Sequence, residues 1–228
     1  MANILKQGIA HFNKKNYEKA LSFFSNLDAD SLELSEHSEI AYYVGLSFAK
    51  LKKIDEAIPY IEQVVTSGES IERINQCRLI LGVFYSMTNR EKMALFEFNK
   101  LLESGYKTAN VFCGLAFVAW EQENTELSVE YYEKALQLDS SNPTAMNGLA
   151  YVLACLDRDL KRALSLCKKA LDYAPESAAF LDSLGWIYYK LGLIKEAKKY
   201  IKRAKEINPK AKEILEHYKV VSSIKEQR

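Results

Sequence analysis

Cysteine and histidine are the residues of this chain that could bind a metal or act as nucleophiles. The four cysteines lie far apart, and no Cys-x-x-Cys pair occurs; they are Cys77, Cys113, Cys155 and Cys167. The three histidines are equally isolated, namely His11, His37 and His217. A zinc site needs several ligands at short spacing, and the glycine-rich phosphate loops and nucleophile elbows of common enzymes are also missing. We therefore expect a non-catalytic protein without a cofactor or metal, whose cysteines are reduced and lie in or near the core.

The composition is that of a helical globular protein. Of the 228 residues, 48% are apolar and 27% are charged, which is ordinary for a folded soluble chain. There are nine glycines and four prolines, fewer than average usage of about 7% and 5% would give, so tight turns are few. The 31 basic and 30 acidic side chains leave a net charge of +1. The molecule as a whole therefore has no strong field for nucleic acid or a membrane.

The sequence offers no targeting or membrane-spanning segment. Lys6, Gln7 and the polar run 13–16 interrupt the N-terminal apolar residues, so no secretory core is present. The longest apolar stretch, at 111–120, has about ten residues, against roughly twenty for a membrane span. We expect a cytoplasmic protein without membrane insertion.

An internal repeat is the most informative feature of the chain. Six times, a small residue is followed twelve positions later by another, the fifth time with one extra residue. The pairs are Gly8/Ala20, Gly45/Ala57, Gly82/Ala94, Ala116/Ser128, Ala150/Ala163 and Gly185/Ala197. Further bulky or small apolar residues four and seven positions after each pair extend one helical face. Small residues let two antiparallel helices cross closely, so each unit is predicted to be a helix hairpin. A short hairpin cannot bury its apolar stripe alone, so the hairpins must stack into a solenoid.

The last full unit resembles the tetratricopeptide repeat, whose pattern is W-x-x-L-G-x-x-Y followed by A-x-x-x-F, A and P. Its matching residues are Leu181, Leu184, Gly185, Tyr188, Ala197, Ile201, Ala204 and Pro209. The resemblance covers six units over about residues 2–209. It is weakest in the first unit, and in the fourth the register stays open between Ala116 and Gly114. It implies an all-α fold, a right-handed α-solenoid of antiparallel helix hairpins.

The repeat also predicts how the chain is organised. We expect one superhelical domain over 1–228. Its repeats are predicted at about 1–34, 38–71, 75–107, 109–142, 143–176 and 178–209. Residues 210–227 alternate apolar and polar positions at helical spacing, and we expect them to form a cap helix over the last hairpin, as solenoids require.

In the tetratricopeptide family, positions 5, 9 and 12 of each first helix line a concave groove. Position 9 here is apolar or aromatic throughout, with Ile9, Leu46, Val83, Phe117, Tyr151 and Trp186. Positions 5 and 12 add Leu5, Tyr42, Leu79, Phe12, Trp120 and Tyr189, and three polar residues, Asn110, Asn147 and Asp182, are candidate guides. One interpretation is half-buried packing between adjacent first helices. The other is an open aromatic groove that binds a peptide or amphipathic helix of a partner protein, as in an adaptor, assembly factor or co-chaperone.

The family's carboxylate clamp, which grips acidic chaperone tails with lysine, asparagine and arginine, is not expected. The corresponding pairs here are apolar or aromatic, namely Leu5/Ile9, Tyr42/Leu46 and Leu79/Val83.

Charge is nevertheless uneven along the chain. Residues 190–228 hold twelve basic and five acidic side chains, a local charge of +7. A basic patch crowds one second helix, with Lys195, Lys198, Lys199, Lys202, Arg203 and Lys205. It is either a solubilising outer face or a site for an anionic partner such as nucleic acid or an acidic protein, although the interleaved aromatics of a single-strand binder are missing. A homo-oligomeric scaffold, in which the groove receives a segment of another copy, is the remaining alternative.

Overall fold

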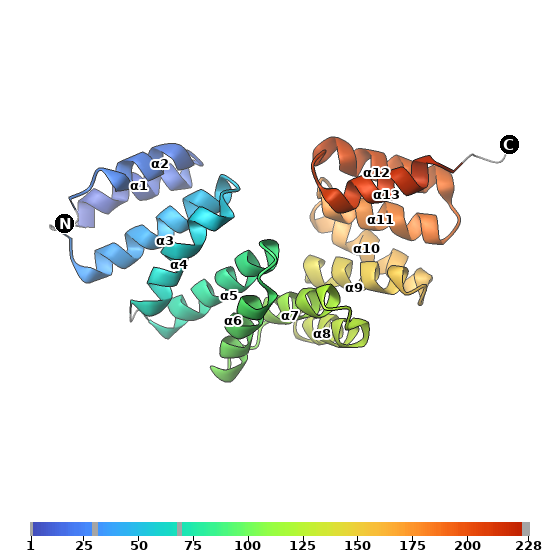
Figure 1. Cartoon of the computed structure of the whole chain (residues 1–228), viewed down its shortest axis with the longest axis horizontal. Coiled ribbons are helices and arrows are strands. Elements are labelled where there is room, and N and C mark those ends of the chain that lie inside the picture. The colour runs from blue at the N-terminus through green and yellow to red at the C-terminus, as the bar shows by residue number, and fades with distance from the viewer. Residues whose placement is uncertain (1, 29–31, 68–69, 225–228) are drawn as a thin grey trace. The chain divides into compact units, whose positions relative to one another are not determined.

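The computed structural model describes residues 2–28, 32–67 and 70–224, and these residues form helices joined by turns, without a strand (Figure 1). The chain divides into two compact units, residues 1–107 and 108–228. The predicted all-α fold of stacked helix hairpins is confirmed. The single-domain organisation stays a prediction.

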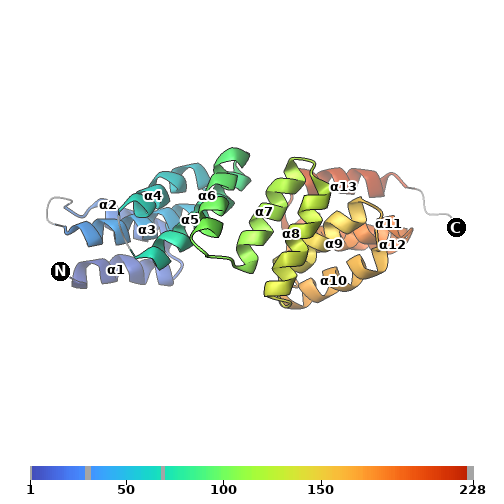
Figure 2. The same ribbon diagram turned by 90° about the horizontal axis from the view of Figure 1, so that it is seen from below.

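Unit 1 contains three consecutive helix pairs. The pairs are α1 (Ala2–Asn13) with α2 (Tyr17–Ser25), α3 (Leu34–Lys50) with α4 (Ile54–Thr66), and α5 (Ile71–Met87) with α6 (Glu91–Glu103). Each helix packs against its hairpin partner, and α2 and α4 also pack against the first helix of the next pair (Figure 2).

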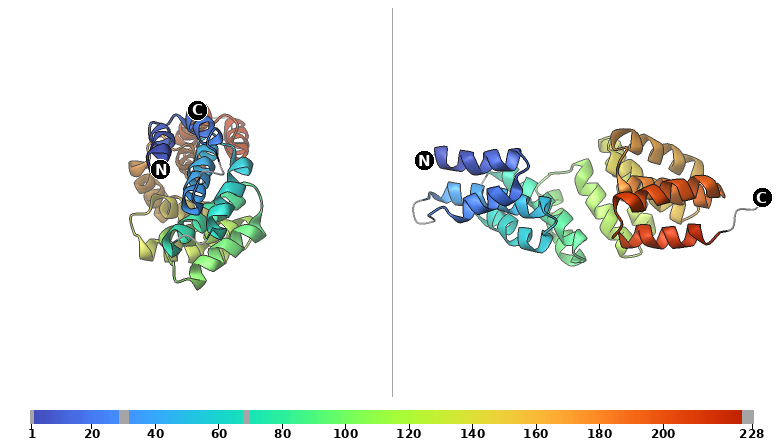
Figure 3. Two further views of the ribbon diagram at one scale, coloured as in Figure 1. Left: turned by 90° about the vertical axis from the view of Figure 1, so that its left-hand side faces the viewer. Right: turned by 90° about the horizontal axis from the view of Figure 1, so that it is seen from above.

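Unit 2 contains three further pairs and one single helix. The pairs are α7 (Ala109–Glu121) with α8 (Thr125–Leu138), α9 (Pro143–Cys155) with α10 (Leu160–Tyr173), and α11 (Ala178–Lys190) with α12 (Ile194–Ile207). The single helix is α13 (Lys212–Ser222). The first helices form a row, since α9 packs against both α7 and α11, and α13 lies against α11 and α12 (Figure 3).

Every hairpin turn contains a residue with positive φ. The residues are Lys15, Lys52, Asn89, Glu123, Asp157 and Gly192, with φ between 53° and 76°. Only the last is a glycine, so the other five turns do not show the usual glycine signal in the sequence. The turn between α9 and α10 has a second such residue, Asp159, whose side chain accepts a hydrogen bond from the Arg162 amide. The extra residue of the fifth repeat therefore lengthens this turn and leaves both helices intact.

The small residues mark the points where paired helices approach closely. A Cβ atom on Gly185 would lie 2.4 Å from Ile201 Cγ1 and 3.2 Å from the Ala197 carbonyl oxygen, which leaves no room for a side chain. In the fourth repeat, Ser128 Oγ donates a hydrogen bond of 2.8 Å to the Ala116 carbonyl, and both residues are fully buried. The structure thus favours Ala116 over Gly114 as the small residue of this repeat.

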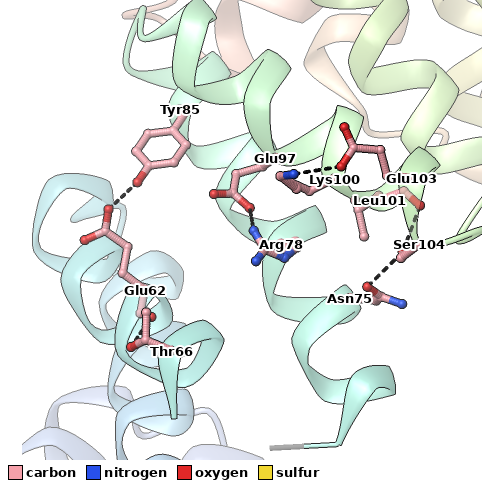
Figure 4. A network of polar contacts seen from close by, with 10 residues as sticks. All are labelled: Glu62, Thr66, Asn75, Arg78, Tyr85, Glu97, Lys100, Leu101, Glu103 and Ser104. Carbon is pink, nitrogen blue, oxygen red and sulfur yellow. Dashed lines mark hydrogen bonds and ion pairs between the residues drawn. The ribbon is translucent and has the colours of Figure 1, made fainter. Parts of the chain in front are cut away.

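A polar network joins the second and third hairpins of unit 1 (Figure 4). The Arg78 guanidinium donates to Glu97 at 2.7 Å, and the Glu97 side chain is 10% exposed. The Tyr85 hydroxyl donates to Glu62 on α4, and Ser104 donates to Asn75 at 3.2 Å. Burial raises the pKa of Glu97, and the neighbouring guanidinium opposes that shift. These contacts satisfy polar groups between packed helices, which is a structural role.

Candidate partner-binding site

The predicted groove residues of unit 1 come from α1, α3 and α5. Leu5 is 6% exposed and belongs to the core, together with Ala20 and Phe24. It was expected to be accessible to a partner, but it is buried. Most of the others are half-buried, and they are Ile9, Phe12, Tyr42, Leu46 and Leu79. Val83 is the most open, at 42% exposed.

Several of these side chains have partners within unit 1. Phe12 packs edge-on against Tyr43 with ring centroids 5.3 Å apart, and the Arg73 guanidinium lies 4.3 Å from the Tyr42 ring centroid. Packing between neighbouring helices therefore accounts for much of this row, which is the first of the two interpretations of the sequence.

In unit 2 the predicted residues of α7 and α9 form an aromatic wall. The rings of Trp120 and Tyr151 meet edge to face with centroids 5.8 Å apart, a favoured geometry for aromatic pairs. Phe117, one helical turn from Trp120, is 40% exposed. Asn147 is half-buried on α9, one turn before Tyr151. This wall contains a large exposed ring beside a polar amide.

The last helix covers the α11 end of the same row. His217 of α13 stacks on the Trp186 ring with centroids 4.1 Å apart and an interplanar angle of 17°. Its Nδ1 lies 2.7 Å from Asp182 Oδ2, and the two side chains are only 10% and 4% exposed. Tyr189 also packs against Trp186, with the two ring centroids 4.8 Å apart. The cap helix thus occupies the predicted groove as well as covering the last hairpin.

This arrangement corrects part of the predicted groove. Trp186 and Asp182 were expected to face an incoming partner, but they contact His217 of the same chain. Buried polar groups are generally hydrogen-bonded, and His217 supplies a partner for one of the two carboxylate oxygens of Asp182. Asn110, another expected polar guide, accepts a hydrogen bond of 3.1 Å from Asn142, which caps the start of α9.

A cavity remains between the aromatic wall and α13. It measures about 310 Å³, near the lower end of ordinary ligand pockets. Four aromatic side chains line it, namely Phe117, Trp120, Tyr132 and Tyr151. Three carboxylates line it as well: Glu121 from α7, Asp182 from α11 and Glu213 from α13. Aromatic and acidic side chains therefore line the space together, and α13 supplies part of the lining.

The charged side chains that line the cavity are all acidic. Burial, followed by the charge of Glu213, raises the pKa of the Tyr151 hydroxyl far above its ordinary value. Tyr132 is affected in the same way, mainly by burial and then by Cys113, Glu121 and Glu213. Among the described residues that line the cavity, none is a lysine or an arginine. A cationic group would therefore be favoured inside it.

Much of the predicted basic patch on α12 interacts with the chain itself. Lys198 Nζ donates to the Ile224 carbonyl at 2.9 Å, Lys205 lies 3.7 Å from the Tyr218 ring centroid, and Arg203 pairs with Glu176. Lys202 lies 3.9 Å from Glu206, and Lys199 lies over Tyr200. Lys195 is exposed. These contacts favour the interpretation of the patch as an outer face that also holds α13.

Among the residues that shape this site, Glu121, Tyr132, Glu213 and His217 were not predicted as site residues from the sequence. A signal for His217 was present, because Ile214, His217 and Val221 are spaced i, i+3 and i+7 and are the buried residues of α13. The spacing places the histidine on the apolar face. Glu213 and Glu121 had no such signal, since carboxylates at helix surfaces are common.

Other chemistry finds no support in the described part of the chain. No group of three or more histidine, cysteine or acidic side chains there could hold a metal ion. None of the described helices is both long and apolar enough to cross a membrane. Three of the cysteines are buried and Cys155 is half-buried, as expected. Burial raises the pKa of Cys113 and Cys167 to about 12, so these thiols are protonated and unreactive at neutral pH.

Comparison with known proteins agrees with the helix hairpins and the small-residue pairs. The tetratricopeptide repeat family matches residues 113–172 and again residues 156–216. Residues 113–216 therefore carry tetratricopeptide repeats. Tetratricopeptide repeats typically form non-catalytic modules for protein–protein interaction, and the fold of this chain supports an interaction module.

Individual relatives of this tetratricopeptide repeat protein are distant. A TPR repeat-containing protein of Methanocaldococcus jannaschii is 23% identical over 205 residues, which are 85% of this chain and 34% of the relative. The chain spans 34%, 13% and 25% of three curated relatives that it matches.

Two solved structures share the fold. The crystal structure of the APC/C hetero-tetramer Cut9-Hcn1 is similar with a TM-score of 0.75 and 14% identity, over 96% of this chain and 42% of that one. The Pseudomonas aeruginosa pilF structure is similar with a TM-score of 0.69 and 16% identity, over 98% and 97% of the two chains.

Proposed function

We propose that this tetratricopeptide repeat protein binds an extended peptide segment of a partner protein at the aromatic wall of unit 2, formed by Phe117, Trp120 and Tyr151. The observation that supports the proposal is the cavity of about 310 Å³ beside the exposed ring of Phe117. A rigid aromatic next to a concave, partly polar space is typical of anchor sites in protein interfaces.

The size of the cavity favours an extended peptide over a helix. A helix with its side chains is about 10–12 Å wide, and α13 already covers the α11 end of the row through His217. The remaining space suits one or two side chains of an extended chain. Its polar groups, among them Asn147 and Asp182, could hydrogen-bond the peptide.

The role is adaptor-like and non-catalytic, and the cytoplasmic location stays a prediction. The anionic-partner alternative is not proposed, because Lys198, Lys205 and Arg203 are engaged by their own chain. No specific contact favours the homo-oligomeric scaffold.

A selection from a random peptide library displayed on phage tests the proposal. Peptides that bind the full chain should lose most of their affinity for Phe117→Ala. The control is Val220→Ala, because Val220 is equally exposed at 40% but lies on α13 outside the cavity lining. Failure to select any peptide, or peptides that bind both variants equally well, would refute a binding site at this place.

A further inference from the structure

The cavity of unit 2 combines aromatic rings with carboxylates in a way that selects a particular charge. Its lining includes Trp120 and Tyr151, which are in edge-to-face contact, and carboxylates from three different helices. Aromatic faces attract cations through their quadrupole, and carboxylates form strong charge-assisted hydrogen bonds with guanidinium groups. Both features favour the same ligand.

Asp182 gives an independent indication. Its side chain is 4% exposed and lines the cavity, and only one of its oxygens, Oδ2, is paired with His217. The other oxygen, Oδ1, is buried and has no hydrogen-bond partner among the described residues. A buried carboxylate oxygen without a donor is costly. A donor brought by a ligand would remove that cost.

The carboxylates are arranged from the inside to the rim. Asp182 is buried, whereas Glu121 and Glu213 are exposed. Glu213 at the rim places a negative charge at the entrance, and a cation would be attracted by it before it reaches the buried oxygen.

We propose that this cavity binds the side chain of an arginine in the partner peptide. The inference rests on the proposed function and adds the chemical class of the anchor. The planar guanidinium stacks on the aromatic rings of the wall while its N–H groups point to Asp182 Oδ1 and to Glu213. The helix α13 takes part in recognition, because it contributes Glu213 and Ile214 to the lining.

The test compares two blocked pentapeptides, Gly-Gly-Arg-Gly-Gly and the same peptide with citrulline in place of arginine. Citrulline has nearly the same shape but no charge. Binding to the full chain is followed by NMR at the indole N–H signals, of which there are two because the chain has two tryptophans. We expect the arginine peptide to bind about tenfold more tightly, as one charge-assisted hydrogen bond would give. Equal affinities, or no binding of either peptide, would overturn the inference.

A matched pair of variants locates the effect. Glu213→Gln should weaken the arginine peptide about three- to tenfold and leave the citrulline peptide unchanged. Glu216→Gln makes the same charge change on the same helix, outside the lining, and should alter neither peptide more than about twofold. Equal effects of the two variants would mean that the attraction is a general field and would refute the site.

The peptide selection separates the inference from the proposed function. Selected peptides that depend on Phe117 and share an arginine support both. Peptides that depend on Phe117 but lack any basic residue leave the binding site in place and refute the arginine anchor.

Discussion

His217→Ala tests whether α13 is held in the groove of unit 2 by the buried histidine. The substitution leaves Asp182, whose side chain is 4% exposed, without its partner and removes the ring that stacks on Trp186 at 4.1 Å. Breaking a buried ion pair or charged hydrogen bond costs about 3–5 kcal/mol when one partner remains. Loss of an aromatic contact adds about 0.5–1.5 kcal/mol.

We therefore expect His217→Ala to lower the free energy of unfolding of unit 2 by about 3.5–6.5 kcal/mol, or roughly 10–25 °C in Tm. Tryptophan fluorescence during urea unfolding is the appropriate assay. Both tryptophans, Trp120 and Trp186, lie in unit 2, so the signal reports that unit alone. Emission of the folded variant should also shift to longer wavelength, because Trp186 loses its cover.

Two controls make the experiment decisive. Glu216→Ala changes an exposed residue of the same helix and should shift stability by no more than about 0.5 kcal/mol. The double variant Asp182→Ala with His217→Ala should cost less than the sum of the two single variants, because no unpaired carboxylate remains. A loss below about 1 kcal/mol for His217→Ala, with unchanged emission, would show that α13 is not seated as described.

Three further predictions concern the packing of the repeats. Leu184→Ala removes a side chain that is 2% exposed in the core of unit 2 and should cost about 2–5 kcal/mol by the same fluorescence assay. Gly82→Ala places a Cβ 2.4 Å from a ring carbon of buried Phe98 and should cost about 1–3 kcal/mol, less the helix propensity that alanine gains. Adding Phe98→Leu to this variant should recover part of the loss. If the losses of the two single variants simply add in the double variant, the contact is contradicted. Arg78→Met removes the charge that opposes the raised pKa of Glu97. The Glu97 carboxyl of the variant therefore binds its proton more tightly in the folded than in the unfolded state. The variant should therefore be nearly as stable as the wild type below the ordinary value of 4.5, and its destabilisation should grow to about 2–3 kcal/mol as pH rises through the folded pKa. Circular dichroism melts across this range check the sign, and a loss that does not vary with pH would refute it.

Local spacing was sufficient to predict the hairpins. The contacts that build them join residues about twelve to sixteen positions apart, such as Gly185 with Ala197 and Ile201. Such contacts repeat in every unit and so leave a periodic record in the sequence. The buried small residues follow from that record, and the apolar spacing within residues 210–227 predicts the cap helix itself. The positive-φ turns do not, since lysine, asparagine and acidic residues occupy most of them.

The candidate site could be predicted only in part. The aromatic wall of Phe117, Trp120 and Tyr151 follows from the repeat positions, and the structure brings these residues to one cavity. Whether each side chain faces open space or a neighbour depends on what packs above it. Leu5 lies in the core and Asp182 pairs with His217, 35 positions away.

The sequence by itself determined that this chain is a stack of helix hairpins, because each hairpin is specified by short-range spacing that recurs along the chain. Only the tertiary structure decided that α13 lies beside the aromatic row of unit 2, where its Glu213 and Ile214 help to close a cavity. That arrangement depends on contacts of α13 with α9, α11 and α12, which occur once in the chain and therefore leave no repeated pattern to read.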